Sequence, residues 1–190
     1  IDIQRRYRGT GEKLIEDFMI LANEAVATYI GNCNLPGVYR VHGNVNEERL
    51  RKFIQVLSVL GIDIKDNLNS INQKTIQRII KIIHDKRPEA FQVLSTYMLS
   101  CMAKAKYQTE NIGHFALALR NYTHFTSPIR RYPDLLLHRA IKAHLKNKPS
   151  PLSGAALDEA GTHFSATERR ADEASRSVTT WLKCHYMQQH

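Results

Sequence analysis

Apolar side chains recur every three to four positions along most of the chain. This spacing predicts helices that each turn one apolar face inward. The first predicted helix has a broad apolar face, from Leu14 to Val26, which indicates burial on more than one side. We expect a mainly α-helical fold with a few short β-strands. The pattern predicts helices over residues 11–30, 46–60, 70–83, 88–102, 127–145 and 156–186.

Capping and turn residues support several of these boundaries. Asn46 is a suitable N-cap for the second helix, and residues 70–73 (Ser-Ile-Asn-Gln) resemble a capping box. Pro36-Gly37 predicts a turn followed by a short extended segment. Residues 114–119 and 122–126 are rich in apolar, aromatic and β-favouring side chains. We expect them to form either a hairpin or an irregular segment near an active site.

Composition narrows the classes of protein. The 190 residues suffice for one domain with a real core, and 43% apolar with 24% charged residues is typical of globular proteins. No apolar run approaches the roughly 20 residues that span a bilayer, so we expect no membrane segment. Cys33, Cys101 and Cys184 form no metal-binding or disulfide pattern, which favours a reducing, cytoplasmic compartment. The chain has no initiator methionine, so we expect it to begin inside a longer protein.

The net charge of +9 favours polyanionic partners, with nucleic acid first and an anionic membrane second. An inert basic surface is the alternative. Aromatic side chains lie among the basic ones, as suits single-stranded nucleic acid, in which bases stack and phosphates pair with cations. The basic residues gather in one stretch: Arg120, Arg130, Arg131, Arg139, Lys142, Lys146 and Lys148.

The segment 126–134 (Thr-Ser-Pro-Ile-Arg-Arg-Tyr-Pro-Asp) carries the most specific chemistry. Ser127 is a good N-cap, and Pro128 suits the first helical position. Arg130 and Arg131 would then lie near a helix N-terminus, where cations are unfavourable. A bound phosphate would resolve this conflict. Pro133 allows a second interpretation, in which the regular helix begins only there and a turn precedes it.

Several residues in this region have ordinary structural interpretations. Phe115, Phe125 and Tyr132 are expected in the core rather than stacked on bases. Asp134 and His138 are four residues apart and are expected to form a structural pair. His114 and His124 are expected to hydrogen-bond the backbone rather than to bind a metal, and His84-Asp85 is expected to lie on the surface.

A longer pattern is similar to one known family. Residues 114–117 (His-Phe-Ala-Leu), then 122–134 and His138, resemble the signature of the ribonuclease II / ribonuclease R (RNB) family. Residues 14–23 resemble its acidic helix. Residues 166–174 with 181–184 resemble the closing helix in its ribonuclease R branch. The resemblance spans nearly the whole chain.

The resemblance implies an enzyme that degrades single-stranded RNA processively from the 3′ end to nucleoside 5′-monophosphates, at a magnesium site. Arg130 matches the family's catalytic arginine. Glu16, or Asp17 beside it, matches a carboxylate that recognises ribose. Arg131, Tyr132 and Arg120 are expected to contact RNA, and Glu168 and Arg169 to line the same channel.

One departure from the family pattern matters. The family binds magnesium through a tight aspartate cluster, whereas no three aspartates of this chain are close in sequence. The strand patterns of the family's flanking oligonucleotide-binding barrels are also missing. We therefore expect residues 1–190 to be the later part of the α/β RNB catalytic domain, with the magnesium ligands elsewhere in the intact enzyme. The isolated fragment is expected to be inactive.

Two other classes of function remain open. The chain could be a non-catalytic module that binds single-stranded RNA without a metal site, or a helical interaction protein with incidental charge. The intact enzyme is expected to be monomeric, while the fragment can self-associate through exposed core.

Overall fold

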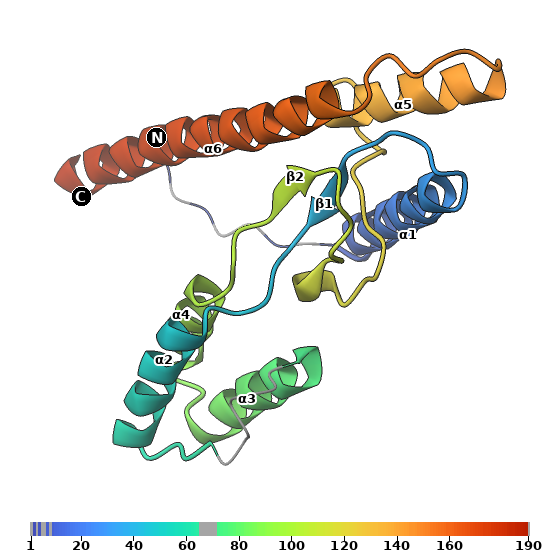
Figure 1. Cartoon of the computed structure of the whole chain (residues 1–190). Coiled ribbons are helices and arrows are strands. Elements are labelled where there is room, and N and C mark those ends of the chain that lie inside the picture. The colour runs from blue at the N-terminus through green and yellow to red at the C-terminus, as the bar shows by residue number, and fades with distance from the viewer. Residues whose placement is uncertain (1, 3, 5–6, 8, 65–71, 190) are drawn as a thin grey trace. The chain divides into compact units, whose positions relative to one another are not determined.

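The computed structural model describes residues 2, 4, 7, 9–64 and 72–189. Its elements are mainly helices, with two short strands that pair with each other (Figure 1), which confirms the expected fold class. No helix in the described residues is long and apolar enough to cross a membrane. In chain order the elements are α1 (Thr10–Asn32), β1 (Tyr39–Val41), α2 (Glu47–Val59), α3 (Gln73–Lys86), α4 (Phe91–Ser100), β2 (Lys106–Gln108), the 3₁₀ turn η1 (Phe115–Leu117), α5 (Tyr132–Leu145) and α6 (Ala155–Gln189).

The chain divides into two compact units, and the second comprises residues 41–105 and 112–120. Helices α2, α3 and α4 supply most of its core, which includes Phe53, Ile79 and Met98. Asn46 caps α2 as predicted, since its side chain accepts a 2.9 Å hydrogen bond from the amide of Arg49. The predicted capping box lies partly outside the described residues; Asn72 caps α3.

The first unit comprises residues 1–40, 106–111 and 121–190. Its core cluster contains Val38, Tyr107 and Phe164. Strand β2 lies close against α6, where a β-carbon on Gly161 would come within 3.2 Å of the Tyr107 carbonyl oxygen. The hydroxyl of Ser165 accepts a 2.9 Å hydrogen bond from the Tyr107 amide. A small residue and a short polar one therefore allow α6 to approach the strand backbone.

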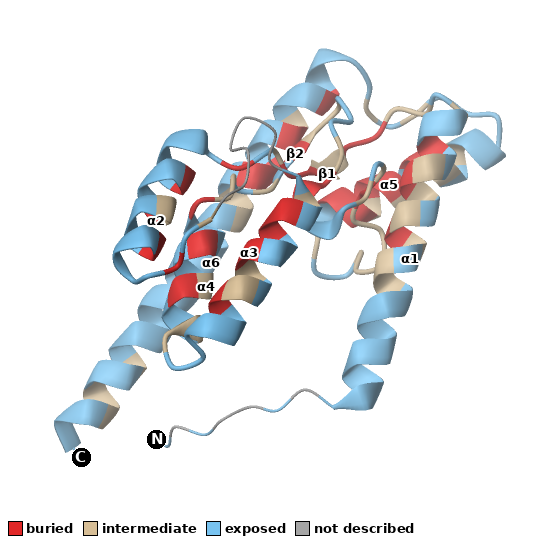
Figure 2. Ribbon diagram, turned by 90° about the horizontal axis from the view of Figure 1, so that it is seen from below, coloured by how far each residue is buried: buried red, intermediate tan, exposed pale blue. Residues whose placement is uncertain are grey.

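Helix α1 matches its predicted range, but the prediction of burial on several sides is wrong for its first half. Figure 2 shows that half exposed. The buried residues of α1, Asn23, Ala27 and Ile30, all lie in its second half, because only that half packs against the rest of the unit. Four large apolar side chains of the first half are between 53% and 59% exposed: Leu14, Ile15, Phe18 and Leu21.

Residues 114–119 and 122–126 belong to neither strand and are irregular apart from η1, which confirms the irregular interpretation; its place near an active site stays a prediction. In the second unit, η1 is flanked by Gly113 and Ala118, both with positive φ. In the first unit, the residues from Tyr122 onward are extended without belonging to a strand. The Arg40 amide donates to the Tyr122 carbonyl at 2.9 Å, and the Thr123 hydroxyl donates to the Val38 carbonyl at 2.7 Å. Strand β2 was not predicted from the sequence, because its three residues are too few to show a strand pattern.

Candidate functional site

The two arginines of the segment 126–134 precede a helix rather than lying within its first turn. Helix α5 begins at Tyr132, with Arg131 as its N-cap and Pro133 in the first turn. The carbonyl of Ser127 accepts hydrogen bonds from the amides of Arg130 (3.3 Å) and Arg131 (3.1 Å), which closes a turn. The helix start at Ser127 was therefore wrong, and the second interpretation, in which a turn precedes a helix that begins close to Pro133, is confirmed. The extended backbone of Arg131 (φ −127°, ψ 118°) separates the turn from the helix.

Arg130 and Arg131 have different surroundings. The Nη2 group of Arg131 lies 2.8 Å from Oδ1 of Asp134, whose side chain is fully buried. Arg130 is exposed, and its guanidinium forms no hydrogen bond or ion pair with any other described residue. The carboxylate thus neutralises Arg131 locally, whereas the charge of Arg130 faces solvent. Only Arg130 retains all its donors for an external anion.

The predicted pair of Asp134 and His138 does not form. The Asp134 carboxylate turns instead toward Arg131 and the Ser127 amide, which donates to Oδ1 at 2.8 Å. His138 Nε2 donates to the Phe125 carbonyl at 2.9 Å. Its ring also stacks on the Phe125 ring, with centroids 3.9 Å apart. Both side chains of the expected pair therefore hold the segment that precedes α5.

A cluster of polar and aromatic side chains around Tyr107 stabilises the first unit. Arg40 forms an ion pair with Glu168 (Nη1 to Oε2, 2.6 Å), and its guanidinium lies 4.6 Å from the Tyr107 ring centroid. A 2.7 Å hydrogen bond joins the Tyr107 hydroxyl to Nδ1 of His124. Glu168 is thus held by Arg40, and this ion pair joins α6 to β1.

The predictions for the other aromatic residues and histidines had mixed outcomes. Phe115 is buried, as predicted, and Phe125 is half-buried. Tyr132 is 51% exposed, so its prediction as a core residue was wrong; its ring packs on Phe164 and beneath Arg139 at the surface.

The predictions for the histidines also had different outcomes. His114 Nδ1 accepts a 3.3 Å hydrogen bond from the Leu117 amide, which confirms its backbone role. His124 Nδ1 shares a 2.7 Å hydrogen bond with the hydroxyl of Tyr107, and its expected hydrogen bond to the backbone stays a prediction. His84 and Asp85 lie exposed at the end of α3, as expected.

The remaining candidate residues are distributed over both units. Glu16 and Asp17 are exposed on α1, and Arg169 is exposed on α6. These three belong to the first unit, together with Arg130, whereas Arg120 is an exposed residue of the second unit. The structure therefore assembles Arg130, Arg131 and Tyr132 at one turn, while Glu16 belongs to the same unit on another helix.

The described residues do not provide a magnesium site of the expected kind. Within residues 9–64 and 72–189, no group of three or more His, Cys, Asp or Glu side chains gathers in a way that could hold a metal. Asp134 already accepts hydrogen bonds from Arg131 and Ser127 through Oδ1. A magnesium ion needs several converging oxygen ligands, so these residues do not fit the ion.

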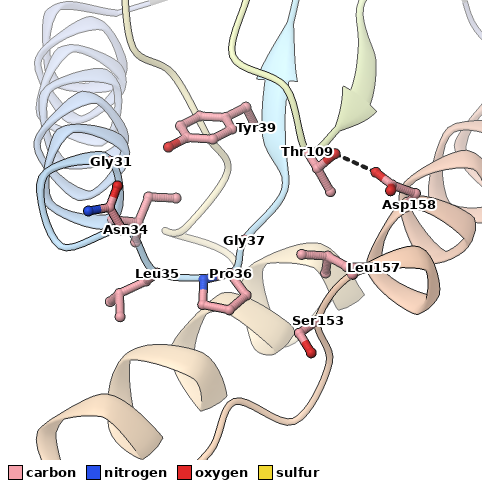
Figure 3. Close-up of a pocket in the computed structure, with 12 residues that line it drawn as sticks. Gly31, Asn34, Leu35, Pro36, Gly37, Tyr39, Thr109, Ser153, Leu157 and Asp158 are labelled. Atoms are coloured by element: carbon pink, nitrogen blue, oxygen red, sulfur yellow. Dashed lines mark hydrogen bonds between the residues drawn. The ribbon is translucent and has the colours of Figure 1, made fainter.

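A cavity of about 390 Å³ lies elsewhere in the first unit, between the end of α1 and the start of α6 (Figure 3). Its lining includes Tyr39, Gly37 and Ser153, but none of the candidate residues. The Thr109 hydroxyl donates to the Asp158 carboxylate, which joins the end of β2 to the first turn of α6. The cavity is thus lined by the chain segment that follows α1, by Thr109 and by the start of α6. These lining residues do not form a cluster of catalytic groups.

Three residues of the site were not identified from the sequence. Asn23, Arg40 and Tyr107 lie 102, 128 and 17 positions from the partners that define their roles, Phe125, Glu168 and His124. No local pattern marks an asparagine inside a helix as a partner of a distant backbone amide. Only the folded arrangement of the chain identifies them.

The Tyr107 hydroxyl should make stability sensitive to alkaline pH. Burial, followed by the nearby Glu168 carboxylate, raises the pKa of Tyr107 from 10.0 to about 12. The neutral form is favoured in the fold, so this contribution is complete below pH 10 and is lost as the pH rises toward 12. We expect the free energy of unfolding, from denaturant titrations, to fall between pH 10 and 12 more steeply in the wild type than in Tyr107→Phe. Equal slopes would contradict this prediction.

Comparison with known proteins extends over the whole chain. The RNB domain family matches residues 1–147. Ribonuclease R 1 of Lactococcus lactis is 43% identical over 194 residues, which cover 100% of this chain and 24% of that protein. Ribonuclease R of Escherichia coli is 40% identical over 197 residues, covering 97% of this chain and 24% of that protein. This chain spans about a quarter of the length of these relatives.

The fold agrees with the sequence comparison. The solved structure of Mycoplasma genitalium RNase R in complex with ribose methylated single-stranded RNA superposes with a TM-score of 0.85 and 28% identity. The match covers 96% of this chain and 29% of that one. The segment 114–138, whose geometry distinguishes Arg130 from Arg131, lies within the matched residues 1–147. The chain belongs to the RNB domain family.

Proposed function

We propose that this chain is part of a 3′→5′ exoribonuclease and supplies side chains that hold single-stranded RNA at its scissile end. The observation that carries this proposal is the exposed guanidinium of Arg130, which has no partner among the described residues and lies in a family segment. Similarity to ribonuclease R along the full chain supports it. The RNA in one similar solved structure supports single-stranded RNA as the substrate.

Arg130 is the proposed catalytic residue. A guanidinium presents five N–H donors in a planar fork that matches phosphate oxygens. In the proposed reaction, Arg130 stabilises the negative charge that develops on the phosphate under attack. Arg131 is less suited to this role, because Asp134 engages it and it is mostly buried. The two adjacent arginines therefore divide into one that binds substrate and one that holds the turn.

Other residues are proposed to bind the RNA chain. Tyr132, two residues after Arg130, has a half-exposed ring on which a base can stack. Glu16 is proposed to accept a hydrogen bond from the 2′-hydroxyl of a ribose, which distinguishes RNA from DNA. Arg120 is proposed to contact a phosphate. Processive removal of nucleoside 5′-monophosphates is the proposed outcome of these contacts in the longer protein.

We further propose that the chain is the later part of an RNB-type catalytic domain and that the magnesium ligands lie elsewhere in the longer protein. This agrees with the absence of a carboxylate cluster among the described residues. When bound, magnesium would activate a water molecule and polarise the phosphate. The residues of this chain bind and orient the RNA.

Replacing Arg130 in the longer protein tests the catalytic proposal. Arg130→Ala should lower the single-turnover rate of hydrolysis of a single-stranded oligoribonucleotide in magnesium by about 100- to 1,000-fold, since one charge-stabilising donor group is lost. Arg51→Ala is a matched control, because Arg51 is an exposed arginine on α2. It should cleave at the wild-type rate. A wild-type rate in Arg130→Ala would remove Arg130 from the mechanism.

The chain by itself should bind RNA without cleaving it. Because phosphate contacts release counterions, the logarithm of the binding constant should fall with the logarithm of salt concentration, by about 0.7 per phosphate contacted. Fluorescence anisotropy with a labelled single-stranded RNA measures this slope, and gel electrophoresis detects cleavage. Cleavage of RNA by the chain alone would refute the proposal that the magnesium ligands lie elsewhere in the longer protein. Absence of salt-sensitive binding would favour a helical interaction protein.

The exposed apolar side chains in the first half of α1 should cause the isolated chain to self-associate. Leu14 and Phe18 lie one helical turn apart and are both more than half exposed, so they form part of a contiguous apolar patch. Sedimentation velocity should show concentration-dependent oligomers that are lost in the Leu14→Glu/Phe18→Glu variant. Val59→Glu, at an exposed apolar residue of α2, is the control and should leave association unchanged. A monomeric wild type at all concentrations would contradict this.

A further inference from the structure

Three consecutive backbone amides immediately before the Arg130 turn are bound by buried side chains from two helices. Asn23 Oδ1, on α1, accepts hydrogen bonds from the amides of Phe125 (2.9 Å) and Thr126 (3.3 Å). Asp134 Oδ1, on α5, accepts from the next amide, that of Ser127, at 2.8 Å. Asn23 is 3% exposed and Asp134 is 0% exposed. We call Asn23, Asp134 and the three amides they bind the amide clamp.

The two clamp side chains are themselves held in orientation. The Asn23 amide group donates to the Tyr122 hydroxyl at 3.2 Å, which fixes which end of the amide faces the backbone. Asp134 Oδ1 is held by Arg131 at 2.8 Å. Buried polar groups that lose their partner carry the full cost of desolvation. The amide clamp is therefore an ordered feature with few alternative arrangements.

The clamp leads directly to Arg130 through the backbone. Ser127 is held at its N–H by Asp134, while its carbonyl accepts from the amide of Arg130. The position of the Arg130 α-carbon thus depends on where Ser127 is held. The side chain of Arg130 has no hydrogen bond of its own to any described residue, so the backbone is what directs it.

Asn23 also connects this turn to the helix that carries Glu16. The two residues are seven positions apart on α1, which is close to two full turns, so they lie on the same side of the helix about 10 Å apart. Asn23 binds the segment that leads to Arg130. The amide clamp therefore ties together the two elements that bear the proposed ribose-binding and phosphate-binding residues.

We propose that Asn23 and Asp134 are positioning residues for RNA hydrolysis, which act by holding the turn that directs Arg130 at the scissile phosphate. The inference rests on the proposed function of Arg130. Neither residue touches RNA in this proposal. Both are buried, and both act on backbone amides. Misplacement of a catalytic group by about 1 Å can lower a rate 100-fold, so the clamp should influence the rate more than RNA affinity.

A double-mutant cycle in the longer protein tests this. Asn23→Leu is nearly isosteric and removes the oxygen that accepts from Phe125 and Thr126. It should lower the single-turnover rate by about 100-fold in the wild-type background. In the Arg130→Ala background it should change the rate by no more than about twofold, because its effect passes through Arg130. The same large loss in both backgrounds would overturn the inference, since a general structural defect does not depend on Arg130.

Hydrogen exchange supplies a second readout that does not depend on activity. In Asn23→Leu, exchange should accelerate at Phe125 and Thr126; in Asp134→Asn it should accelerate at Ser127 and Arg131, where the charge that holds the turn is lost. Unchanged exchange rates at these amides in both variants would overturn the proposal that the amide clamp holds the turn. Asp134→Asn retains an oxygen and the side-chain shape, so it serves as the second variant if Asn23→Leu does not fold.

Controls separate this inference from the proposed function. Asn46→Ala removes the same kind of bond, an asparagine oxygen that accepts an amide, from the start of α2. It should lower the melting temperature and leave the rate of RNA hydrolysis unchanged. An inactive wild type would overturn the proposed function, and the inference with it. An active wild type that loses activity in Arg130→Ala but keeps it in Asn23→Leu and Asp134→Asn would overturn the inference alone.

Discussion

The buried carboxylate of Asp134 is the interaction on which the arrangement of the site depends. A carboxylate is costly to bury unless opposite charge and hydrogen-bond donors surround it. Here Arg131 and the Ser127 amide both donate to Oδ1, while Oδ2 is buried without a hydrogen-bond partner among the described residues. The pairing holds Arg131 against the start of α5. Its neighbour Arg130 is left with its charge toward solvent.

Contacts between distant parts of the chain surround this pair. Asn23 on α1 binds amides about a hundred positions later, and His138 on α5 stacks on Phe125. The amides of residues 125–127 are bound by the side chains of Asn23 and Asp134, which satisfy these backbone groups in place of a strand partner. This explains why an irregular segment can present Arg130 in a defined place. Loops that carry functional groups commonly depend on such a supporting shell.

Helix α6 contributes to the same unit through packing and charge. Gly161 allows the helix to approach β2 closely, and Ser165 satisfies the Tyr107 amide. The Arg40–Glu168 pair then joins the helix to β1 under partly buried conditions, where such a pair contributes more than at the surface. The unit is thereby held together across residues that are far apart in sequence.

The sequence by itself determined the helical content, most helix boundaries, the N-cap at Asn46 and the family, because periodicity, capping and a long motif are local properties. It also identified Arg130 as the candidate for binding phosphate. Only the tertiary structure decided that α5 begins at Tyr132, that Asp134 pairs with Arg131 rather than His138, and that Asn23 belongs to the site. These outcomes depend on which groups meet after folding. A buried carboxylate forms its hydrogen bonds with the strongest donors that lie close to it in the folded protein. The order of residues along the chain does not give those distances.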